Sequence, residues 1–281
     1  MTRVAAIQVT SELYNSTANR AATNQAIQEA ADAGANLVVL PELAISGYGI
    51  DRDGLLQACE PIDGPTVSQW SKIARARDIW VVGGLCESDG AELYNSAVLV
   101  GPSGLAGHYR KLHPFDAEKD VFSPGNKGLS VAETPIGRIG ICVCYDLRFV
   151  EVARALALQG ADIIAVPTAW VGGFDPNPRD AMGFIGQARG AMVQANLNQV
   201  YMACASQGGQ AGATRFLDSS MIIDPFGDVL AGPMPEDASG MAISDVSFDK
   251  LSAARVRSAR IRPRSDRRTD VYEIRVGGVS Y

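Results

Sequence analysis

The sequence predicts an α/β protein built from two mixed β-sheets covered by helices. Short apolar runs typical of buried strands alternate along the chain with alanine-rich segments of helical spacing. Two blocks, residues 4–40 and 138–166, place strand, helix and strand in the same order, which indicates a pseudo-symmetric pair of sheets. A hairpin signal, Gly101-Pro-Ser-Gly104, joins two neighbouring strands, so antiparallel pairs are expected beside parallel ones.

The individual elements follow from periodicity and from the residues that end each segment. Strands are expected at residues 4–9, 36–40, 79–85, 95–100, 106–111, 138–143, 162–166, 199–206, 219–224, 228–230 and 240–246. Helices are expected at residues 18–33, 67–76, 150–158 and 180–197, with glycine stop signals after the first and third. No linker-like tract divides the chain, so we expect one domain at residues 1–262 and an extended polar arm at residues 263–281.

Composition limits the classes of function. The 281 residues are 47% hydrophobic and 20% charged, which is ordinary for a globular protein with a sizeable core. The 25 basic and 31 acidic residues give a formal net charge of -6, so no nucleic-acid partner is expected. The chain has neither a signal-peptide core nor an apolar run of about 18 residues, so we expect neither export nor a membrane partner.

The five cysteines are expected to be reduced thiols. Their number is odd and their spacings are scattered, which favours a reducing, cytoplasmic location over a disulfide scaffold. Zinc would need more ligands than the Cys142–Cys144 pair and the two histidines supply at suitable spacing, so no metal is expected. The cysteines interpreted as ordinary core residues are Cys59, Cys86, Cys142 and Cys204.

Three separated segments carry a family resemblance. They are LVVLPELAISGY at residues 37–48, YRKLHPFDAEKDVFSPGN at 109–126 and GRIGICVCYDLRFVEVARALALQGADIIAVPTAW at 137–170. In this order and spacing they resemble the carbon–nitrogen hydrolase (nitrilase-like) superfamily, in its amidase or carbamoylase branch. Weaker echoes at residues 94–100 and 224–231 extend the resemblance from about residue 4 to about residue 247.

The resemblance implies an architecture as well as an activity. The fold would be a four-layer α-β-β-α sandwich of two mixed sheets covered by helices, and no cofactor would be needed. Relatives commonly pair through the helices near the nucleophile. We therefore expect a homodimer or larger homo-oligomer, with the helix at residues 150–158 and the arm at residues 263–281 in the interface.

The resemblance also implies a catalytic set of Glu42, Lys111 and Cys144, with Glu118 as a second glutamate. Cys144 would be the nucleophile, Glu42 the general base and Lys111 the group that stabilises the oxyanion. Glu118 would orient Lys111 and the substrate amide. The residues themselves support this reading, because Glu42 directly follows a buried strand, where α/β sheets place their ligands.

Substrate contacts are expected from aromatic residues and from the turn after the nucleophile. The backbone N–H of Tyr145 would be a second oxyanion donor. The residues expected to line the pocket are Tyr48, His113, Phe115, Phe149, Trp170 and Phe174, although each ring could equally be ordinary packing. Asp146 and Arg148 are expected to form an ion pair that fixes the turn; alternatively, Arg148 receives a substrate carboxylate.

The implied reaction is hydrolysis of a small linear carboxamide to the carboxylic acid and ammonia through a Cys144 thioester. Nitrilases of this family usually have Cys-Trp-Glu at the nucleophile, whereas this chain has Cys-Tyr-Asp at residues 144–146, which favours an amidase. An N-carbamoyl amino acid or amine amidohydrolase is the alternative, and a nitrilase is less favoured. Two further classes stay open: a member that binds without catalysis, and a subunit that supplies ammonia to a synthetase.

The helix expected at residues 180–197 departs from the usual family pattern. Many relatives have an Arg-Ala-x-Glu-Asn core there, whereas this chain has Gln194 or Ala195 at the Glu position. No specific substrate is therefore carried over from the resemblance.

Overall fold

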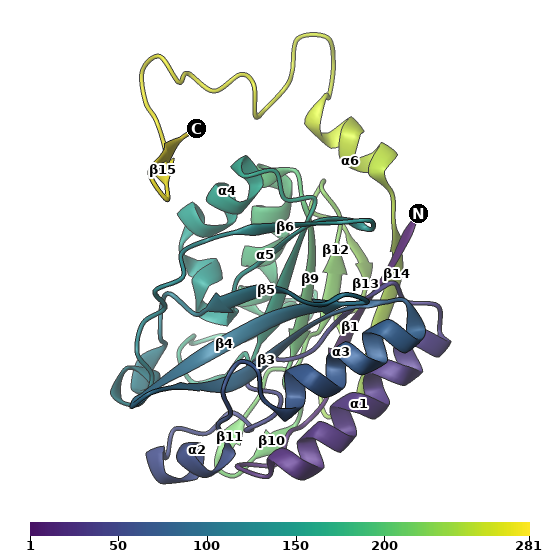
Figure 1. Ribbon diagram of the computed structural model, residues 1–281. Helices are drawn as coiled ribbons and strands as arrows, with labels where there is room; N and C mark the ends of the chain where they lie inside the picture. The colour runs from purple at the N-terminus through teal and green to yellow at the C-terminus, as the bar shows by residue number, and fades with distance from the viewer.

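The computed structural model describes residues 1–281 and shows two six-stranded sheets between two layers of helices (Figure 1). The first half of the chain contains β1 (Thr2–Gln8), α1 (Ser16–Asp32), β2 (Leu37–Val39), α2 (Arg52–Ala58), α3 (Pro65–Arg77), β3 (Trp80–Asp89), β4 (Glu92–Gly101), β5 (Gly104–Arg110), the 3₁₀ helix η1 (Asp116–Asp120), β6 (Val131–Thr134), β7 (Gly137–Ile141) and the 3₁₀ helix η2 (Cys144–Arg148). The second half contains α4 (Val150–Leu158), β8 (Ile163–Thr168), α5 (Gly186–Asn198), β9 (Tyr201–Ser206), β10 (Gln210–Ala211), β11 (Thr214–Arg215), β12 (Met221–Ile223), β13 (Val229–Ala231), β14 (Gly240–Val246), α6 (Phe248–Arg255), β15 (Arg275–Val276) and β16 (Val279–Ser280).

The two sheets have equivalent topologies. The first runs β14-β1-β2-β3-β4-β5 and the second runs β13-β12-β9-β8-β7-β6. In each sheet three neighbouring strands are parallel, β1, β2 and β3 in the first and β7, β8 and β9 in the second, and the other pairs are antiparallel. This arrangement confirms the predicted fold class, a four-layer sandwich of two mixed sheets.

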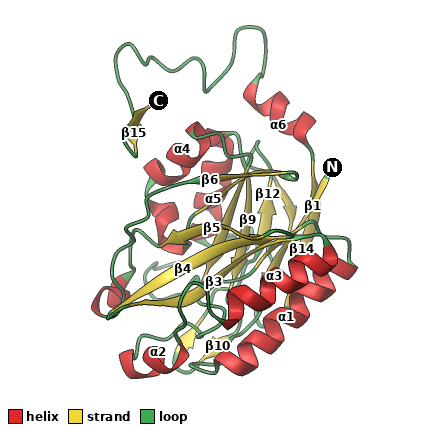
Figure 2. Ribbon diagram, in the orientation of Figure 1, coloured by secondary structure: helices red, strands yellow, loops and turns green.

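Three apolar clusters separate the four layers. One lies between the sheets and includes Val82 and Leu99 from the first sheet and Ile139 from the second. Another joins α1 and α3 to the first sheet around Trp70, and a third joins α4 and α5 to the second sheet around Leu156. Figure 2 shows α1 and α3 side by side over one face, with α4 and α5 on the opposite side of the molecule. The central strands read as continuous apolar runs because both of their faces are buried.

Helix α1 illustrates how sequence spacing sets a layer. The side chain of Asn15 caps its first turn. Asn19, Thr23, Ile27 and Ala30 recur at helical spacing and are its buried residues. This single buried stripe holds the helix against the first sheet.

Helix α5 begins later than the sequence pattern predicts. Residues 180–185 form a turn in which the Asp180 carboxylate accepts hydrogen bonds from the backbone N–H groups of Met182 and Phe184, each at 2.9 Å. A side chain that satisfies nearby N–H groups competes with the helix, so α5 starts only at Gly186. The short helices α2 and α6 and the strand β6 also lie outside the predicted elements.

The arm at residues 263–281 is extended and ends in the small β15–β16 hairpin (Figure 1). Arg264 anchors its start by donating hydrogen bonds to the carbonyls of Ala157 at 2.8 Å and Asn198 at 2.7 Å. These carbonyls lie at the C-terminal ends of α4 and α5, where a cation is favoured. None of the helices is both long enough and apolar enough to cross a membrane.

Candidate active site

Four polar side chains from separate segments gather beyond the carboxyl ends of the strands. Glu42 follows β2, Lys111 follows β5, Glu118 lies in η1, and Cys144 opens η2 after β7. Glu42 and Glu118 are fully buried, and Lys111 is 1% exposed. The fold therefore brings together the four residues that the sequence pattern singled out.

Lys111 lies between two carboxylates. Its Nζ is 2.6 Å from Glu42 Oε1 and 2.9 and 2.8 Å from the two carboxylate oxygens of Glu118. Burial alone would lower the pKa of Lys111, but attraction to Glu42 and Glu118 raises it above the ordinary value for a lysine. The ammonium therefore stays charged, as a buried cation with two opposite charges can.

Glu42 keeps one carboxylate oxygen free. Its Oε1 accepts hydrogen bonds from Lys111 and from Asn95 Nδ2 at 2.7 Å, while Oε2 is buried without a hydrogen-bond partner. Burial raises the pKa of Glu42, Lys111 opposes the shift, and Glu118 adds to it. Asn95 was given no role from the sequence, although it lies in the weaker family echo at residues 94–100.

The backbone of Glu42 is fixed from two directions. Its N–H donates to the Thr168 carbonyl at 3.3 Å, and its carbonyl accepts from Gln207 Nε2 at 3.0 Å. Gly84 of β3 lies against the same segment, where a Cβ would come within 2.7 Å of the Pro41 carbonyl oxygen. Glycine is therefore required at this close approach.

Cys144 lies on a strained turn. Its φ is +45°, in the left-handed region that costs a side-chain-bearing residue about 1–3 kcal/mol. Cys144 is half-buried and lines a cavity, and the burial of its thiol raises its pKa above the ordinary value for cysteine. Glu42 adds to the shift and Lys111 opposes it. The thiol is therefore protonated at neutral pH and needs a base before it can attack.

Asp146 holds the turn that carries Cys144. Its Oδ2 accepts hydrogen bonds from the Tyr109 hydroxyl at 2.7 Å and from the Val143 N–H at 3.0 Å. Its Oδ1 lies 2.7 Å from His113 Nδ1 and accepts the His113 N–H at 3.2 Å. An ionised carboxylate can only accept, so Nδ1 carries the proton in this contact.

The predicted Asp146–Arg148 ion pair is wrong. The Asp146 side chain points into the protein, where these four donors satisfy it, and Arg148 is exposed. His113 also differs from the prediction that it lines the substrate pocket. Its ring stacks on Phe149 with centroids 3.6 Å apart, and it lines neither cavity at the site.

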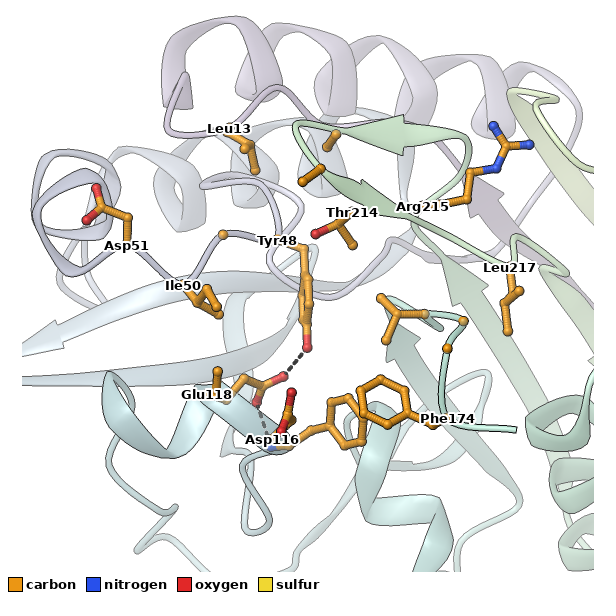
Figure 3. Close-up of a pocket in the computed structure, with 18 of the residues that line it drawn as sticks. Leu13, Tyr48, Ile50, Asp51, Asp116, Glu118, Phe174, Thr214, Arg215 and Leu217 are labelled. Carbon is orange, nitrogen blue, oxygen red and sulfur yellow. Dashed lines mark hydrogen bonds between the residues drawn. The ribbon is translucent and has the colours of Figure 1, made fainter. Parts of the chain in front are cut away.

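Two adjoining cavities lie at the site, one lined by Glu118 and the other by Cys144. The larger has a volume of about 700 Å³ and is lined by residues including Tyr48 and Glu118 (Figure 3). The Tyr48 hydroxyl donates to Glu118 Oε1 at 2.6 Å. The residues lining the smaller cavity, of about 80 Å³, include Cys144, Tyr145, Arg148 and Trp170. Phe115, Val171 and Phe174 belong to the walls of both cavities.

Of the predicted pocket residues, Tyr48, Phe115, Tyr145, Trp170 and Phe174 line one or both of these cavities, whereas His113 and Phe149 line neither. Tyr48 lies in the larger one, whereas Tyr145 and Trp170 lie with Cys144 in the smaller one. No group of three His, Cys, Asp or Glu side chains is arranged to hold a metal ion. A thiol, a carboxylate with a free oxygen and a buried ammonium can together support nucleophilic attack on a polarised carbonyl.

The fold and this site define a carbon–nitrogen hydrolase: the sequence model of that family matches residues 3–256, and the chain belongs to it. A nitrilase from Pyrococcus abyssi (strain GE5 / Orsay) is 35% identical over 249 residues, which cover 88% of this chain and 90% of the relative. The omega-amidase NIT2 of Homo sapiens is 33% identical over 260 residues, with 88% of each chain covered.

A solved structure shares both the fold and the length. It is a mutant amidase from Nesterenkonia sp. AN1 that carries acrylamide added to its active-site cysteine. It matches with a TM-score of 0.75 and 25% identity, covering 96% of this chain and 98% of that chain. The protein described here is thus an enzyme, a hydrolase that acts on non-peptide carbon–nitrogen bonds.

Proposed function

We propose that the protein is an amidase that converts a small linear carboxamide into the carboxylic acid and ammonia. One observation carries the proposal: the buried Glu42–Lys111–Glu118 array is assembled close enough to Cys144 for the charges of Glu42 and Lys111 to act on its thiol. The Nesterenkonia relative, an amidase with acrylamide on its active-site cysteine, supports the choice of a cysteine as nucleophile.

In the first half-reaction, Cys144 Sγ attacks the carbonyl carbon of the amide. Its proton passes to Glu42 Oε2, the carboxylate oxygen without a hydrogen-bond partner. Lys111 and the backbone N–H of Tyr145 stabilise the oxyanion, because a charge fixed in a dry site acts more strongly than one in water. Glu42 then gives the proton to nitrogen, the C–N bond breaks, and ammonia leaves a Cys144 thioester.

In the second half-reaction, water hydrolyses the thioester. Glu42 takes a proton from the water as its oxygen attacks the acyl carbon, and the same ammonium and N–H hold the new oxyanion. The C–S bond breaks, the thiolate recovers the proton from Glu42, and the acid is released. Glu118, fixed by Tyr48, keeps Lys111 in place through both steps.

An N-carbamoyl amino acid is the second candidate substrate. Arg148 lines the small cavity beside Cys144 and forms no ion pair within the chain, so it is free to receive a carboxylate. The Pyrococcus relative is named a nitrilase, which keeps nitriles in the test. The omega-amidase and the Nesterenkonia amidase support amides as the first choice.

We also propose that the enzyme works as a homo-oligomer in which α4 and α5 meet a second copy. Val150, Val193 and Leu197 are 59%, 57% and 51% exposed, and all three line one groove of about 670 Å³ on these helices. Clustered exposed apolar side chains are typical of protein interfaces. Light scattering should show at least a dimer, and V193D/L197D should release monomers; a monomeric wild-type chain would refute this proposal.

Ammonia release from a substrate panel tests the reaction. The panel contains aliphatic amides, aromatic amides, N-carbamoyl amino acids and the matching nitriles, each with wild type and Cys144→Ala. Release from amides that Cys144→Ala abolishes is the expected result. Release from nitriles alone, or release that persists in Cys144→Ala with the same rate, would refute the amidase mechanism.

A further inference from the structure

The large cavity beside the proposed catalytic residues has an unbalanced charge. Its charged lining residues are Asp51, Asp116, Glu118 and Arg215 (Figure 3). Glu118 is paired with Lys111, whose Nζ lies 2.8 Å from Glu118 Oε2, and Lys111 is shared with Glu42, so this buried array adds no net positive charge. The charge that a ligand meets in this cavity therefore depends on the other three residues.

Arg215 is already paired outside the cavity. Its Nη2 lies 2.8 Å from Asp237 Oδ2 and 3.9 Å from Glu236 Oε2. Figure 3 shows its guanidinium directed away from Tyr48 and Glu118. With two acidic partners, Arg215 adds no net positive charge to the cavity.

Asp51 and Asp116 have no such compensation. Asp116 is exposed on η1 and makes neither an ion pair nor a side-chain hydrogen bond. Asp51 accepts only the Gly54 N–H, at 2.9 Å, as the N-cap of α2. Two exposed carboxylates on the lining of one cavity attract cations and repel anions, most strongly at low ionic strength. The Asp51 carboxylate is directed away from Tyr48 and Glu118 in Figure 3, so Asp116 is the main contributor.

Aromatic rings connect this acidic lining to the proposed nucleophile, Cys144. Tyr48, Phe115 and Phe174 line the large cavity, and Phe115 and Phe174 also border the small cavity that contains Cys144. Phe115 and Phe174 meet edge to face with centroids 4.8 Å apart. Aromatic faces are favourable neighbours for an alkyl chain and for an ammonium group.

We propose that the preferred substrate is a linear ω-amino amide, with Asp116 as its main specificity determinant. The carboxamide lies at Cys144, the alkyl chain runs past Phe115 and Phe174, and the terminal ammonium faces Asp116, with Asp51 on the far rim. The inference rests on the proposed amidase function and names its substrate class.

Arg148 offers the opposing arrangement. It is an unpaired cation lining the small cavity beside Cys144, so a substrate with a carboxylate near the reacting group would use it. The ω-amino amide instead directs its charge into the large cavity. The substrate panel separates these two arrangements.

The hydrolysis test uses three matched series at low ionic strength: ω-amino amides of butanoic, pentanoic and hexanoic acid, neutral amides with a methyl group in place of the ammonium, and half-amides of the corresponding dicarboxylic acids. The kcat/KM should be about tenfold higher for the amino amide than for its neutral partner and lowest for the half-amide. Added salt should reduce the difference in kcat/KM between the amino amide and its neutral partner. Equal values, or a preferred half-amide that R148Q abolishes, would overturn the proposal.

A pair of variants assigns the preference to one residue. In D116N the ratio of kcat/KM for the amino amide to that for its neutral partner should fall about three- to fivefold. Asp120 is exposed on the same 3₁₀ helix but does not line the cavity, so D120N should keep the wild-type ratio. The same fall in both variants would mean that general surface charge, not Asp116, sets the preference.

Calorimetry on Cys144→Ala separates this inference from the proposed function. The variant should bind the amino amide more tightly than its neutral partner, whether or not the wild type hydrolyses either. Selective binding without any hydrolysis would sink the amidase proposal and retain the cation preference. Hydrolysis of the neutral amides without selective binding of the amino amides would do the reverse.

Discussion

Lys111 Nζ lies 2.6 Å from Glu42 Oε1, and both side chains are buried. This contact joins segments 69 residues apart and sets an ammonium beside the carboxylate that we propose as the base. The charges of both groups act on the pKa of the Cys144 thiol. Because Glu118 adds a second buried carboxylate, Lys111 is the single cation that offsets the negative charge of both glutamates.

Removing that cation should destabilise the fold as well as stop the reaction. Lys111→Ala leaves two buried carboxylates facing one another. Removing one partner of a buried ion pair lowers the free energy of unfolding by about 3–5 kcal/mol. Urea unfolding at neutral pH measures this decrease in the free energy of unfolding. Lys119→Ala on η1 is the matched control, since Lys119 is exposed and should change stability by less than about 0.5 kcal/mol. Equal stability of the two variants would contradict the account.

The acid limb of activity should lie above the ordinary pKa of a glutamic acid, 4.5, because burial raises the pKa of Glu42. Glu42 must be ionised to accept the thiol proton, so kcat/KM should fall as the pH drops through that raised pKa. Glu118 contributes to the upward shift, so Glu118→Gln should move the acid limb to lower pH. A pH profile of kcat/KM measures both; an acid limb that moves upward in Glu118→Gln would contradict the assignment of Glu42.

A second buried pair predicts how stability depends on pH. Arg110 Nη2 lies 2.5 Å from Glu87 Oε1. Although burial opposes it, hydrogen bonds from His108, Arg110 and Ser96 lower the pKa of Glu87 from 4.5 to about 2. A carboxylate with a lowered folded-state pKa stabilises the protein above the unfolded pKa and loses that effect as the pH falls through the folded one.

Glu87→Gln should therefore destabilise the protein at neutral pH by about 1.5–3 kcal/mol, since Arg110 loses its buried carboxylate partner and keeps only the exposed Asp89 carboxylate, 2.7 Å from its Nη2. The difference from wild type should shrink as the pH falls from 4.5 toward about 2. Denaturant unfolding across this range measures it. A difference that grows in acid would reverse the sign of the linkage and contradict the structure.

The partners of Asp146 can be identified by double-mutant cycles. The structure predicts a coupling energy of about 1 kcal/mol between D146N and H113A, and none between D146N and R148Q. R148Q alone should change stability by less than about 0.5 kcal/mol. Coupling to Arg148 in place of His113 would restore the ion pair that the structure excludes.

A positioning role for Asp146 makes a kinetic prediction as well. D146N should lower kcat more than it changes KM, because it loosens the turn that carries Cys144 without touching the walls of the large cavity. Steady-state kinetics on one amide measures the split. A rise in KM alone would instead place Asp146 in substrate binding.

Much of this fold could be predicted because local patterns and tertiary structure agree. The apolar runs of β1, β2 and β8 and the alanine-rich pattern of α1 correspond to elements of the observed type. The start of α5 could not be predicted, since it depends on the Asp180 carboxylate satisfying backbone groups two and four residues ahead.

Contacts between residues far apart in the sequence also could not be predicted. Sequence proximity suggested Arg148 as the partner of Asp146, whereas its partners Tyr109 and His113 lie 37 and 33 positions away. Asn95 contacts Glu42 across 53 positions, and no local pattern predicts such a contact. The three motifs indicated which residues gather, but only the structure shows that Lys111 bridges two glutamates.

The most direct test of the central claim is mass spectrometry of the enzyme quenched in acid during turnover of an amide. The account predicts that the mass of the substrate's acyl group appears on the peptide containing Cys144 and is absent from Cys144→Ala, which also releases no ammonia. Cys142→Ala, altered at a fully buried cysteine two residues earlier, should retain the adduct. Acyl mass on another residue, or ammonia release at the wild-type rate by Cys144→Ala, would contradict it.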